Sequence, residues 1–486
     1  MFHLLDSLAF HASTRPGQLA IATPRARLNY RQLYDASVGA ALRLAQLGVE
    51  RGQTVGIYAV NPALQYVLAA GANRIGAVIC VLPQEESLLE AALAQVKPDV
   101  LLQDRAVPGA SSSKTIDVDL TWLEGSGSPK ELPPPPFSLM QMGAVCMITM
   151  STGTTGRSKP IGYSVAQFMQ RLPWRTFSAL ATQTGEKTLL LNALPTSYGF
   201  ITMFGMLWGG DTAYMGWTGE PALQLIEAEK INRVMASTPL IVQLARAFET
   251  GPKDCSSLRQ IFAAGDTLPE RFARLIATKM CPNLVIAYGA NEAGMVSTVT
   301  AEQANFDPQC VGYVYPWCRV EVVDEDDNVL PPGMTGMLRI GGASIIQGYL
   351  SQDDGAENRF RNGWFYPGDT GYFRQDGALF VTGRLGAAAE PVTADIQAIN
   401  DVASAHPTVA EAAAFVVRNM AGANEIWLAV VGRDGFDLAA LREHCAKLGA
   451  DAPQRYLVLP SLPRNESGKV MRWRLVELSQ TQKSAP

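Results

Sequence analysis

The chain has 486 residues, a length that predicts two or more domains because a single hydrophobic core rarely grows so large. Charged residues make up 17% of the chain and the formal net charge is −5, which gives no basic footprint for nucleic acid or an anionic membrane surface. No apolar run has the length of a membrane span, and the seven scattered cysteines lack a C-x-x-C pair. We therefore expect a cytoplasmic protein with buried reduced thiols and with neither nucleic acid nor a membrane as partner.

The N-terminal region alternates between helix and strand patterns. Apolar residues recur at helical spacing in 36–48, which ends on Gly48, and again in 63–76. Apolar runs of strand character occupy 54–60 and 77–83. This alternation predicts an α/β domain layered around a largely parallel sheet.

A second alternating region follows after a connector. The segment 126–138 is polar and rich in proline, which is typical of an exposed, stiff linker. Runs of strand composition then occur at 187–195, 233–238, 258–265 and 283–289. We expect a second α/β subdomain here.

The last third changes to a β-rich pattern and then returns to α/β. In 319–342, short apolar runs are split by an acidic turn and Pro-Pro-Gly, which predicts antiparallel hairpins. Small residues near 383–387 suit a hinge. We predict a large N-terminal domain over 1–383, made of layered α/β subdomains and a β-rich subdomain, hinged to a small, mobile α/β domain over 384–486. The small domain is expected to contain strands at 411–418, 426–432 and 455–460 and a helix at 438–449.

The stretch STGTTGRSKP, residues 151–160, directly follows an apolar run and is the first candidate binding loop. Its glycines allow close approach of the backbone to an anion, while N–H groups, hydroxyls and a lysine supply donors. It is not a Walker loop, because Pro160 follows the lysine. The alternative is a flexible surface loop. The residues expected to bind phosphate are Ser151, Thr152, Gly153, Thr154, Thr155, Gly156 and Lys159.

Five stretches in order resemble one family, the AMP-forming adenylating enzymes, which include acyl- and aryl-CoA ligases, luciferases and peptide-synthetase adenylation domains. The resemblance covers nearly the whole chain. The stretches are STGTTGRSKP, AYGANEAG at 287–294, GWFYPGDTGYF at 363–373, Gly383–Arg384 and PRNESGKVMR at 463–472.

The resemblance implies a nucleotide and metal site around 287–294. Tyr288 corresponds to the residue whose ring lies against adenine, and Glu292 to the carboxylate that helps hold Mg²⁺, with Thr155 as a second ligand. One protein carboxylate suffices, because Mg²⁺ keeps waters and binds phosphate oxygens. Asn291 stands where the family usually has threonine, and its amide can still hydrogen-bond phosphate. Taken alone, Tyr288 could be a core aromatic and Glu292 a solvated acid. Further nucleotide-binding positions implied are Ala264, Gly265, Asp266 and Gly289.

Three more positions follow from the resemblance. Asp369 corresponds to the carboxylate that accepts both ribose hydroxyls, although an aspartate after Pro-Gly can also cap a turn. Arg384 corresponds to the arginine at the domain junction that contacts ribose or phosphate. Lys469 corresponds to the catalytic lysine that bridges the substrate carboxylate and the α-phosphate, where negative charge concentrates; the alternative is an exposed lysine near the chain end.

The chain departs from the family pattern at two places. The stretch 383–400 lacks the lysine that follows the junction arginine in the family and is shorter, which bears on the second half-reaction. Tyr198 stands where many relatives have histidine, and no nearby aspartate is present to hold the ammonium of an amino acid. We therefore expect an apolar slot with a polar rim for a planar aryl acid or a medium acyl chain. Its predicted walls are Tyr198, Phe200, Thr238, Ala290 and Gly294.

Taken together, these features predict an ATP- and Mg²⁺-dependent ligase that adenylates a small carboxylic acid and transfers it to a thiol, either coenzyme A or the pantetheine of a carrier protein. The alternatives are a free amine as acceptor, with formation of an amide, or release of acyl-AMP to another enzyme. A non-catalytic nucleotide-binding relative is a further reading. It is disfavoured because Lys469, Glu292 and Asp369 are all present.

Overall fold

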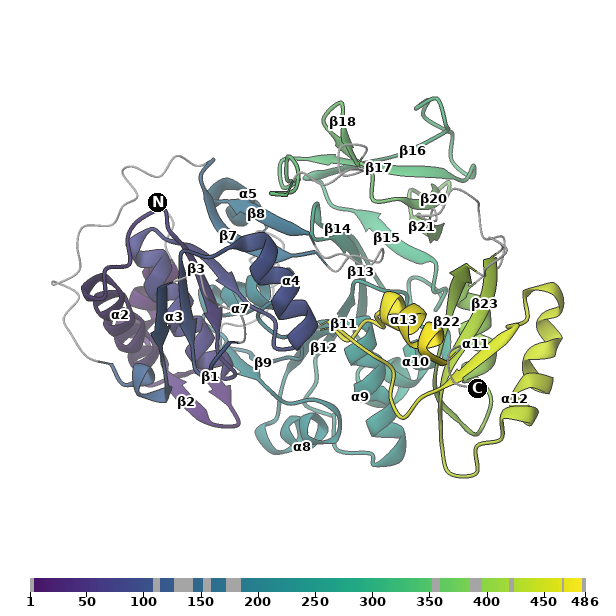
Figure 1. Ribbon diagram of the computed structural model, residues 1–486, viewed down its shortest axis with the longest axis horizontal. Helices are drawn as coiled ribbons and strands as arrows, with labels where there is room; N and C mark the ends of the chain where they lie inside the picture. The colour runs from purple at the N-terminus through teal and green to yellow at the C-terminus, as the bar shows by residue number, and fades with distance from the viewer. Residues whose placement is uncertain are drawn as a thin grey trace. The chain divides into compact units, whose positions relative to one another are not determined.

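The computed structural model describes residues 4–107, 114–125, 143–151, 159–171, 185–351, 359–384, 396–418, 424–465 and 467–482. These residues divide into two compact units. The described residues up to Arg384 form the first unit, and those from Ile396 onward form the second (Figure 1).

One sheet of the first unit follows the predicted α/β alternation. Its strands have the order β6-β5-β3-β4-β7-β8, and all described neighbours pair in parallel except β7 with β8. The predicted, largely parallel sheet is therefore confirmed. The bounds are β3 (Thr54–Tyr58), β4 (Val78–Val81), β5 (Val100–Gln103), β6 (Lys114–Asp117), β7 (Val145–Met150) and β8 (Pro160–Ser164).

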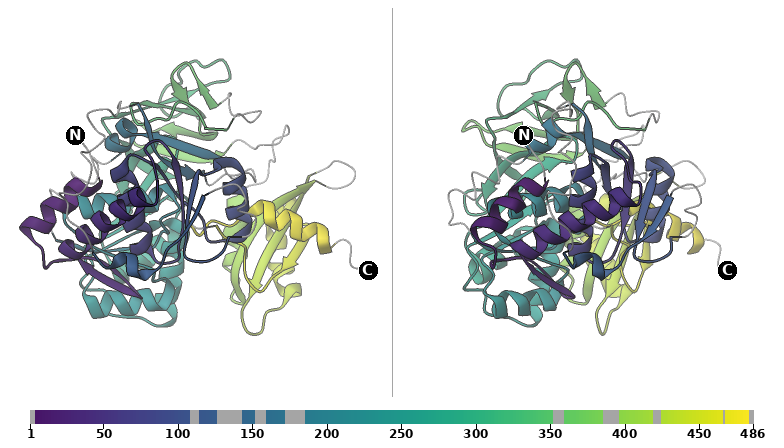
Figure 2. Two further views of the ribbon diagram at one scale, coloured as in Figure 1. Left: turned by 60° about the vertical axis from the view of Figure 1, so that its left-hand side comes forward. Right: turned by 90° about the vertical axis from the view of Figure 1, so that its left-hand side faces the viewer.

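Helices of this region begin and end at recognisable caps. Helix α2 (Tyr30–Gln46) starts before the predicted position 36, because Asn29 and Gln32 form a reciprocal capping box. Helix α3 (Pro62–Ile75) is capped by Asn61 and ends at Gly76, whose φ is 91°. Figures 1 and 2 show α1, α2 and α3, coloured purple to blue, side by side. The other helices here are α1 (Leu4–Thr14), α4 (Glu86–Val96), α5 (Val165–Gln170) and the 3₁₀ turn η1 (Leu120–Leu123).

The other sheet of the first unit has a parallel half and an antiparallel half. Within the described residues it has 15 strands, in the order β18-β19-β17-β20-β21-β15-β14-β13-β12-β11-β9-β10-β1-β2, with β16 paired to β17. Strands from β1 to β13 along this order pair in parallel, and β14 turns the sheet antiparallel. The parallel half contains β1 (Leu19–Thr23), β9 (Lys187–Leu190), β10 (Thr212–Met215), β11 (Arg233–Ser237), β12 (Gln260–Ala264) and β13 (Leu284–Ala290), with β2 (Ala26–Asn29) at its edge. Its helices are α7 (Ser197–Gly209), α8 (Gly219–Glu229), α9 (Thr238–Thr250), α10 (Glu270–Leu275) and the π-helical turn η4 (Ile276–Met280).

The antiparallel half contains the predicted hairpin. Strands β16 (Cys318–Val323) and β17 (Gly336–Gly342) pair antiparallel on either side of the acidic turn, so this prediction is confirmed. The other strands are β14 (Gly294–Thr300), β15 (Cys310–Val314), β18 (Phe360–Arg361), β19 (Trp364–Phe365), β20 (Asp369–Phe373) and β21 (Leu379–Arg384).

The second unit is a three-stranded sheet with helices on both faces (Figure 1). Side chains of β22 (Val409–Arg418) alternate between its faces: Ala414 joins a cluster with helices α11 and α12, while Phe415 packs with Leu475 of α13. The predicted strands and helix of this region are confirmed. The remaining bounds are β23 (Asn424–Gly432), β24 (Arg455–Val458), α11 (Ile396–Ser404), α12 (Leu438–Cys445), the 3₁₀ stretch η6 (Ala446–Asp451) and α13 (Arg472–Gln482).

Two further findings concern the cysteines and the possibility of a membrane-spanning helix. Six of the seven cysteines are buried and free, and Cys318 is partly buried, as expected for reduced thiols. In the described part of the chain, no helix combines the length and apolar character needed to cross a membrane.

Candidate active site

The two ends of the predicted phosphate-binding loop are joined where β7 passes to β8. The Ser151 N–H donates to the Lys159 carbonyl over 2.7 Å, and the Lys159 N–H donates to the Ser151 hydroxyl oxygen over 2.8 Å. The antiparallel pairing of the two strands therefore extends to the start of the loop. The predicted residues between them, Thr152, Gly153, Thr154, Thr155 and Gly156, lie outside the described residues.

Glu292 lies in the connection between β13 and β14, and its carboxylate is bound by a tyrosine. The residue is 9% exposed, and the Tyr349 hydroxyl donates to its Oε1 over 2.7 Å. The Nζ atom of Lys159 lies 5.1 Å from the centroid of the same tyrosine ring, within the range of a cation–π contact. Burial, followed by the Glu292 charge, raises the pKa of Tyr349, so its hydroxyl remains a donor. The structure thus brings Lys159 and Glu292 to one tyrosine, which the sequence analysis missed.

Glycines give the β13–β14 connection its tight shape. A Cβ atom on Gly289 would lie 2.3 Å from the Gly294 carbonyl oxygen, so no side chain fits there. Gly294 has a φ of +82° and pairs with Ala290 across the hairpin. Asn291 and Glu292 therefore occupy a connection whose two ends are fixed by strand pairing.

Tyr288, Asp369 and Arg384 meet in one cluster. The Tyr288 hydroxyl donates to Asp369 Oδ2 over 2.6 Å, and Arg384 Nε lies 3.5 Å from Oδ1. Asp369 and Arg384 are cross-strand partners on β20 and β21, which explains the second contact. Burial and then the Asp369 charge raise the pKa of Tyr288 well above its usual value. The three residues come from separate stretches of the sequence, and strand pairing brings them together.

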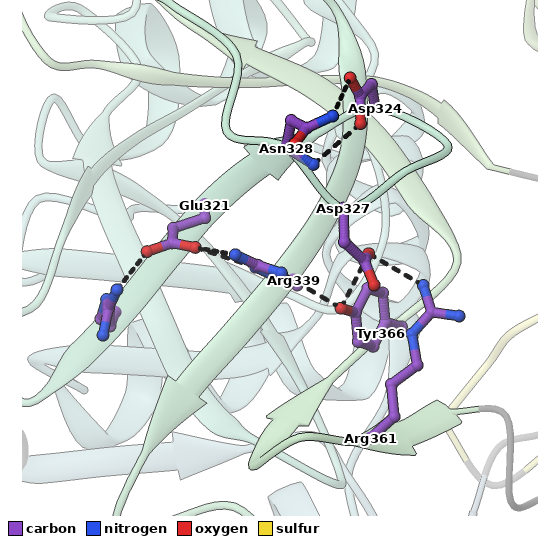
Figure 3. A network of polar contacts seen from close by, with 8 residues as sticks. Glu321, Asp324, Asp327, Asn328, Arg339, Arg361 and Tyr366 are labelled. Carbon is purple, nitrogen blue, oxygen red and sulfur yellow. Dashed lines mark hydrogen bonds and ion pairs between the residues drawn. The ribbon is translucent and has the colours of Figure 1, made fainter.

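The segment before Asp369 is anchored by a polar network (Figure 3). Arg339 donates through Nε to Glu321 over 2.9 Å, and its guanidinium also donates to the Tyr366 hydroxyl oxygen over 3.4 Å. That hydroxyl in turn donates to Asp327, which also accepts from Arg361, each over 3.0 Å. The network ties the β16–β17 hairpin to the residues that lead into β20.

The predicted adenine border lies at the carboxyl end of β12. Gly265, which follows Ala264, has a φ of +87°, a conformation that favours glycine. The Thr238 hydroxyl, at the start of α9, donates to the Asp266 carbonyl over 2.8 Å. The buried Thr238 thus contributes to this turn as well as being a predicted wall of the acid slot.

The other predicted slot residues lie in different settings. Phe200 is 1% exposed and stacks on Tyr66 with ring centroids 6.5 Å apart, so it belongs to the core beneath α7. Tyr198 is partly buried and packs against the same core cluster. Ala290 and Gly294 lie at the two ends of the β13–β14 connection. The acid slot stays a prediction.

Lys469 lies in a closed turn of the second unit. Asn465 accepts through Oδ1 from the Ser467 and Lys469 N–H groups, each over 3.0 Å, and its own N–H donates to the Lys469 carbonyl over 3.0 Å. Arg464 donates to the Gly468 carbonyl over 2.6 Å. These contacts use the backbone of Lys469, so the turn does not depend on its ammonium group.

Comparison with known families identifies the chain. A family described as "AMP-binding enzyme" matches residues 8–350, which is more than half of the sequence. The chain belongs to this family. The predicted family and the predicted class, an adenylate-forming ligase, are confirmed.

Two curated relatives span nearly the whole of this AMP-binding enzyme. It is 23% identical to the 2-succinylbenzoate–CoA ligase of Bacillus licheniformis, over 96% of this chain and 98% of that protein. It is also 23% identical to the fatty acid–[acyl-carrier-protein] ligase ScoC of Streptomyces coeruleorubidus, over 96% of this chain and 95% of that protein.

A solved structure confirms the predicted fold class. The AMP-binding enzyme resembles the O-succinylbenzoate coenzyme A synthetase MenE of Bacillus subtilis, which was determined in complex with ATP and magnesium ion. The TM-score is 0.79 at 22% identity, and the match covers 96% of this chain and 98% of that one.

The sequence analysis missed the residues that support the predicted ligand-binding positions of this AMP-binding enzyme. Tyr349 binds the Glu292 carboxylate, and Arg171 binds the main-chain carbonyls of Asn291 and Glu292 over 2.9 and 3.0 Å. Arg171 is a single arginine after a short apolar helix, and Tyr349 follows a glycine in the connection between β17 and β18, so neither position carries a periodic or motif signal. The nearest sequence signal is the capping box of Ser164 and Gln167, which fixes the start of α5.

Proposed function

We propose that this AMP-binding enzyme uses ATP and Mg²⁺ to convert a small aryl or acyl carboxylic acid to acyl-AMP and then transfers the acyl group to a thiol. In the first step a carboxylate oxygen bonds to the α-phosphorus of ATP, the bond from that phosphorus to the bridging oxygen breaks, and pyrophosphate leaves. In the second step the sulfur of the thiol bonds to the acyl carbon, AMP leaves with the bonding electron pair, and the thiol proton passes to solvent. The names of the two curated relatives support coenzyme A and a carrier-protein thiol as acceptors.

The observation that carries this proposal is the Tyr288–Asp369–Arg384 cluster. Among the described residues, each carboxylate oxygen of Asp369 has one partner, and a carboxylate can accept about four hydrogen bonds. Asp369 therefore keeps acceptor capacity for a vicinal diol. We assign this carboxylate to the two ribose hydroxyls, the Tyr288 ring to adenine and the Arg384 guanidinium to ribose or phosphate.

The residues around Glu292 fit a magnesium ion that is held mainly by nucleotide and water. Among the described residues there is no group of three or more His, Cys, Asp or Glu side chains that could hold a metal. Mg²⁺ does not require such a group, because it retains waters and binds phosphate oxygens. Tyr349 occupies Oε1 of Glu292, and we assign Oε2 to the metal, with the Thr155 hydroxyl as a second ligand. A bound Mg²⁺ would neutralise negative charge on the phosphate oxygens of the nucleotide.

The remaining assignments concern two domains, 1–383, which binds ATP and the acid, and 384–486, which carries Lys469. Lys469 neutralises charge on the substrate carboxylate and the α-phosphate during adenylation, because two anions must approach each other there. Reorientation of the small domain about the hinge at 384–387 then admits the acceptor. The predicted slot receives the acid, and the enzyme acts in the cytoplasm.

Exchange of labelled pyrophosphate into ATP tests the adenylation step. The protein is mixed with MgATP, labelled pyrophosphate and a panel of aryl, acyl and amino acids, and label should enter ATP with at least one aryl or acyl acid. Lys469→Ala should lower the exchange rate by about 10²- to 10³-fold, the usual loss for one transition-state donor. Lys447→Ala is the matched control, because Lys447 is an exposed lysine of the same unit. A Lys469→Ala protein that exchanges at the unaltered rate would remove the catalytic assignment.

The acceptor is identified with the acid that supports exchange. Coenzyme A, a phosphopantetheinylated carrier protein and simple amines are supplied separately, and the acyl product is identified by mass spectrometry. A thioester product supports the proposal. An amide product, or acyl-AMP that persists with every acceptor, would contradict the thiol assignment while leaving adenylation intact.

A further inference from the structure

Arg171 is a buried arginine that binds the backbone on which Glu292 is mounted. The residue directly follows α5 and is 4% exposed. Its Nη1 donates to the Asn291 carbonyl over 2.9 Å, and its Nη2 donates to the Glu292 carbonyl over 3.0 Å and to the Ser344 carbonyl over 2.8 Å. One guanidinium therefore fixes two consecutive carbonyls of the β13–β14 connection.

Tyr163, on β8, holds this guanidinium and the same connection. The Arg171 Cζ atom lies 4.6 Å from the centroid of the Tyr163 ring, a cation–π distance. The Tyr163 hydroxyl lies 3.0 Å from the Asn291 carbonyl oxygen and 2.9 Å from the Ser197 Oγ atom at the start of α7. The Arg171–Tyr163 pair thus connects the Glu292 backbone to the strand that leads out of the phosphate-binding loop.

A second segment holds the other side of the connection. The Ile346 N–H donates to the Glu292 carbonyl over 3.0 Å, and the Ser344 hydroxyl donates to the Ala293 carbonyl over 2.7 Å. Because the same Arg171 also binds the Ser344 carbonyl, the two segments are fixed to each other through one side chain. Removal of the guanidinium would take one donor from each of three carbonyls and leave those of Asn291 and Glu292 with only Tyr163 and the Ile346 N–H among the donors described here.

A buried guanidinium is costly to desolvate, and several hydrogen bonds are needed to compensate for it. A hydrophobic side chain of similar volume could fill the same space without that cost, so packing alone does not explain an arginine here. The planar fork of Arg171 can hold carbonyls at fixed spacing, which neither an apolar side chain nor the single ammonium of lysine can do. The carbonyls that it holds belong to Asn291 and Glu292, the residues assigned above to phosphate and metal.

We propose that Arg171 is a positioning residue that sets the direction of the Glu292 carboxylate, and thereby the affinity of the enzyme for the metal–nucleotide complex. This inference rests on the proposed function, because it takes Glu292 as a metal ligand. Arg171 itself contacts main-chain carbonyls and a tyrosine ring, so its effect on the metal is transmitted through the backbone.

Binding of Mn²⁺ in the presence of an ATP analogue that cannot release pyrophosphate provides the first test, measured by electron paramagnetic resonance on the full chain. Arg171→Met removes the charge, and Arg171→Lys keeps the charge without the fork. We expect Arg171→Met to weaken Mn²⁺ binding at least tenfold, with Arg171→Lys between it and the unmodified protein. Arg233→Met is the control, because Arg233 is also buried in the first unit but pairs with Asp211 over 3.5 Å. It should lower thermal stability without changing Mn²⁺ affinity.

The Mg²⁺ dependence of pyrophosphate exchange is the second readout. The half-saturating Mg²⁺ concentration should rise in Arg171→Met and Arg171→Lys but not in Arg233→Met. If Arg171→Met does not fold, Arg171→Lys and Tyr163→Phe carry the test, since both keep most of the buried volume. Equal Mn²⁺ affinity and equal Mg²⁺ dependence in the folded variants and the unmodified protein would overturn the role of Arg171. Failure of the unmodified protein to bind the metal–nucleotide complex at all would instead refute the proposed function.

Discussion

Asp369→Asn is the substitution that most directly tests the assigned nucleotide site. It preserves the size of the side chain and removes its charge. Asp369 accepts the Tyr288 hydroxyl on Oδ2 and lies near Arg384 through Oδ1. An asparagine has one amide oxygen and one NH₂ group in place of the two carboxylate oxygens. If the amide oxygen keeps the hydrogen bond from the Tyr288 hydroxyl, the NH₂ group faces Arg384, and one hydrogen-bond acceptor for the ribose is lost.

The size of the effect follows from the acceptors that are lost. A hydrogen bond to a charged group contributes about 1.5–3 kcal/mol. Loss of one such bond to a ribose hydroxyl corresponds to an increase of about 10- to 150-fold in KM for ATP. The chemical step should change less, because the ribose hydroxyls take no part in the transfer of the α-phosphorus.

The assay compares ATP with 2′-deoxy-ATP in pyrophosphate exchange. The unmodified enzyme should prefer ATP, and Asp369→Asn should lose most of that preference, since the 2′-hydroxyl no longer finds a charged acceptor. Asp376→Asn is the control, because Asp376 pairs with Arg374 over 2.5 Å in the turn between the same two strands. A variant that keeps both its KM for ATP and its preference for ATP would refute the ribose assignment.

Three further predictions concern the metal, the polar network and the buried thiols. Tyr349→Phe frees the Glu292 carboxylate to rotate and should raise the half-saturating Mg²⁺ concentration of exchange by about tenfold. Glu321→Gln removes the carboxylate shared by Arg319 and Arg339 and should lower the free energy of unfolding by about 1.5–3 kcal/mol, mainly through Arg339, because Arg319 is exposed; unfolding with urea measures this. Burial raises the pKa values of Cys80 and Cys146 to about 12. The contribution of these thiols to the free energy of unfolding is therefore fully present below the unfolded thiol pKa of about 8.5 and is lost as the pH rises toward 12. Across that range each thiol should lower the free energy of unfolding by about 1.4 kcal/mol per pH unit. Equal free energies of unfolding at pH 8 and pH 10 would contradict this prediction.

The periodic elements could be predicted because their signals are local. Segments 54–60 and 63–76 became β3 and α3, since apolar spacing and caps act within a few residues. The turn of the large sheet from parallel to antiparallel was not predicted. It occurs where Gly289 packs on the Gly294 carbonyl, and this contact exists only after the hairpin has formed.

In the candidate site too, some features could be predicted from the sequence and others depend on the folded structure. Tyr288, Glu292 and Asp369 lie in stretches that carry a family resemblance, so their positions could be read from the sequence. The cluster of Tyr288 and Asp369 with Arg384 could not be read in this way, because it depends on the pairing of β20 with β21 and on the place of β13 in the large sheet. The direct bond from Tyr288 to Asp369 also goes beyond the separate adenine and ribose assignments.

Arg171 shows why a supporting residue cannot be found by sequence reasoning even where candidate ligand-binding residues can be. A ligand of fixed chemistry selects particular side chains at fixed spacing, and the resulting pattern remains visible in one sequence. A residue that holds main-chain carbonyls is selected only by the distance between backbone segments in the folded chain. Arg171 lies 120 positions from Asn291 and 173 from Ser344, and its partners are carbonyls that every residue possesses. No side-chain pattern at either partner could therefore have revealed the contact, and only the folded structure shows that a single guanidinium joins them.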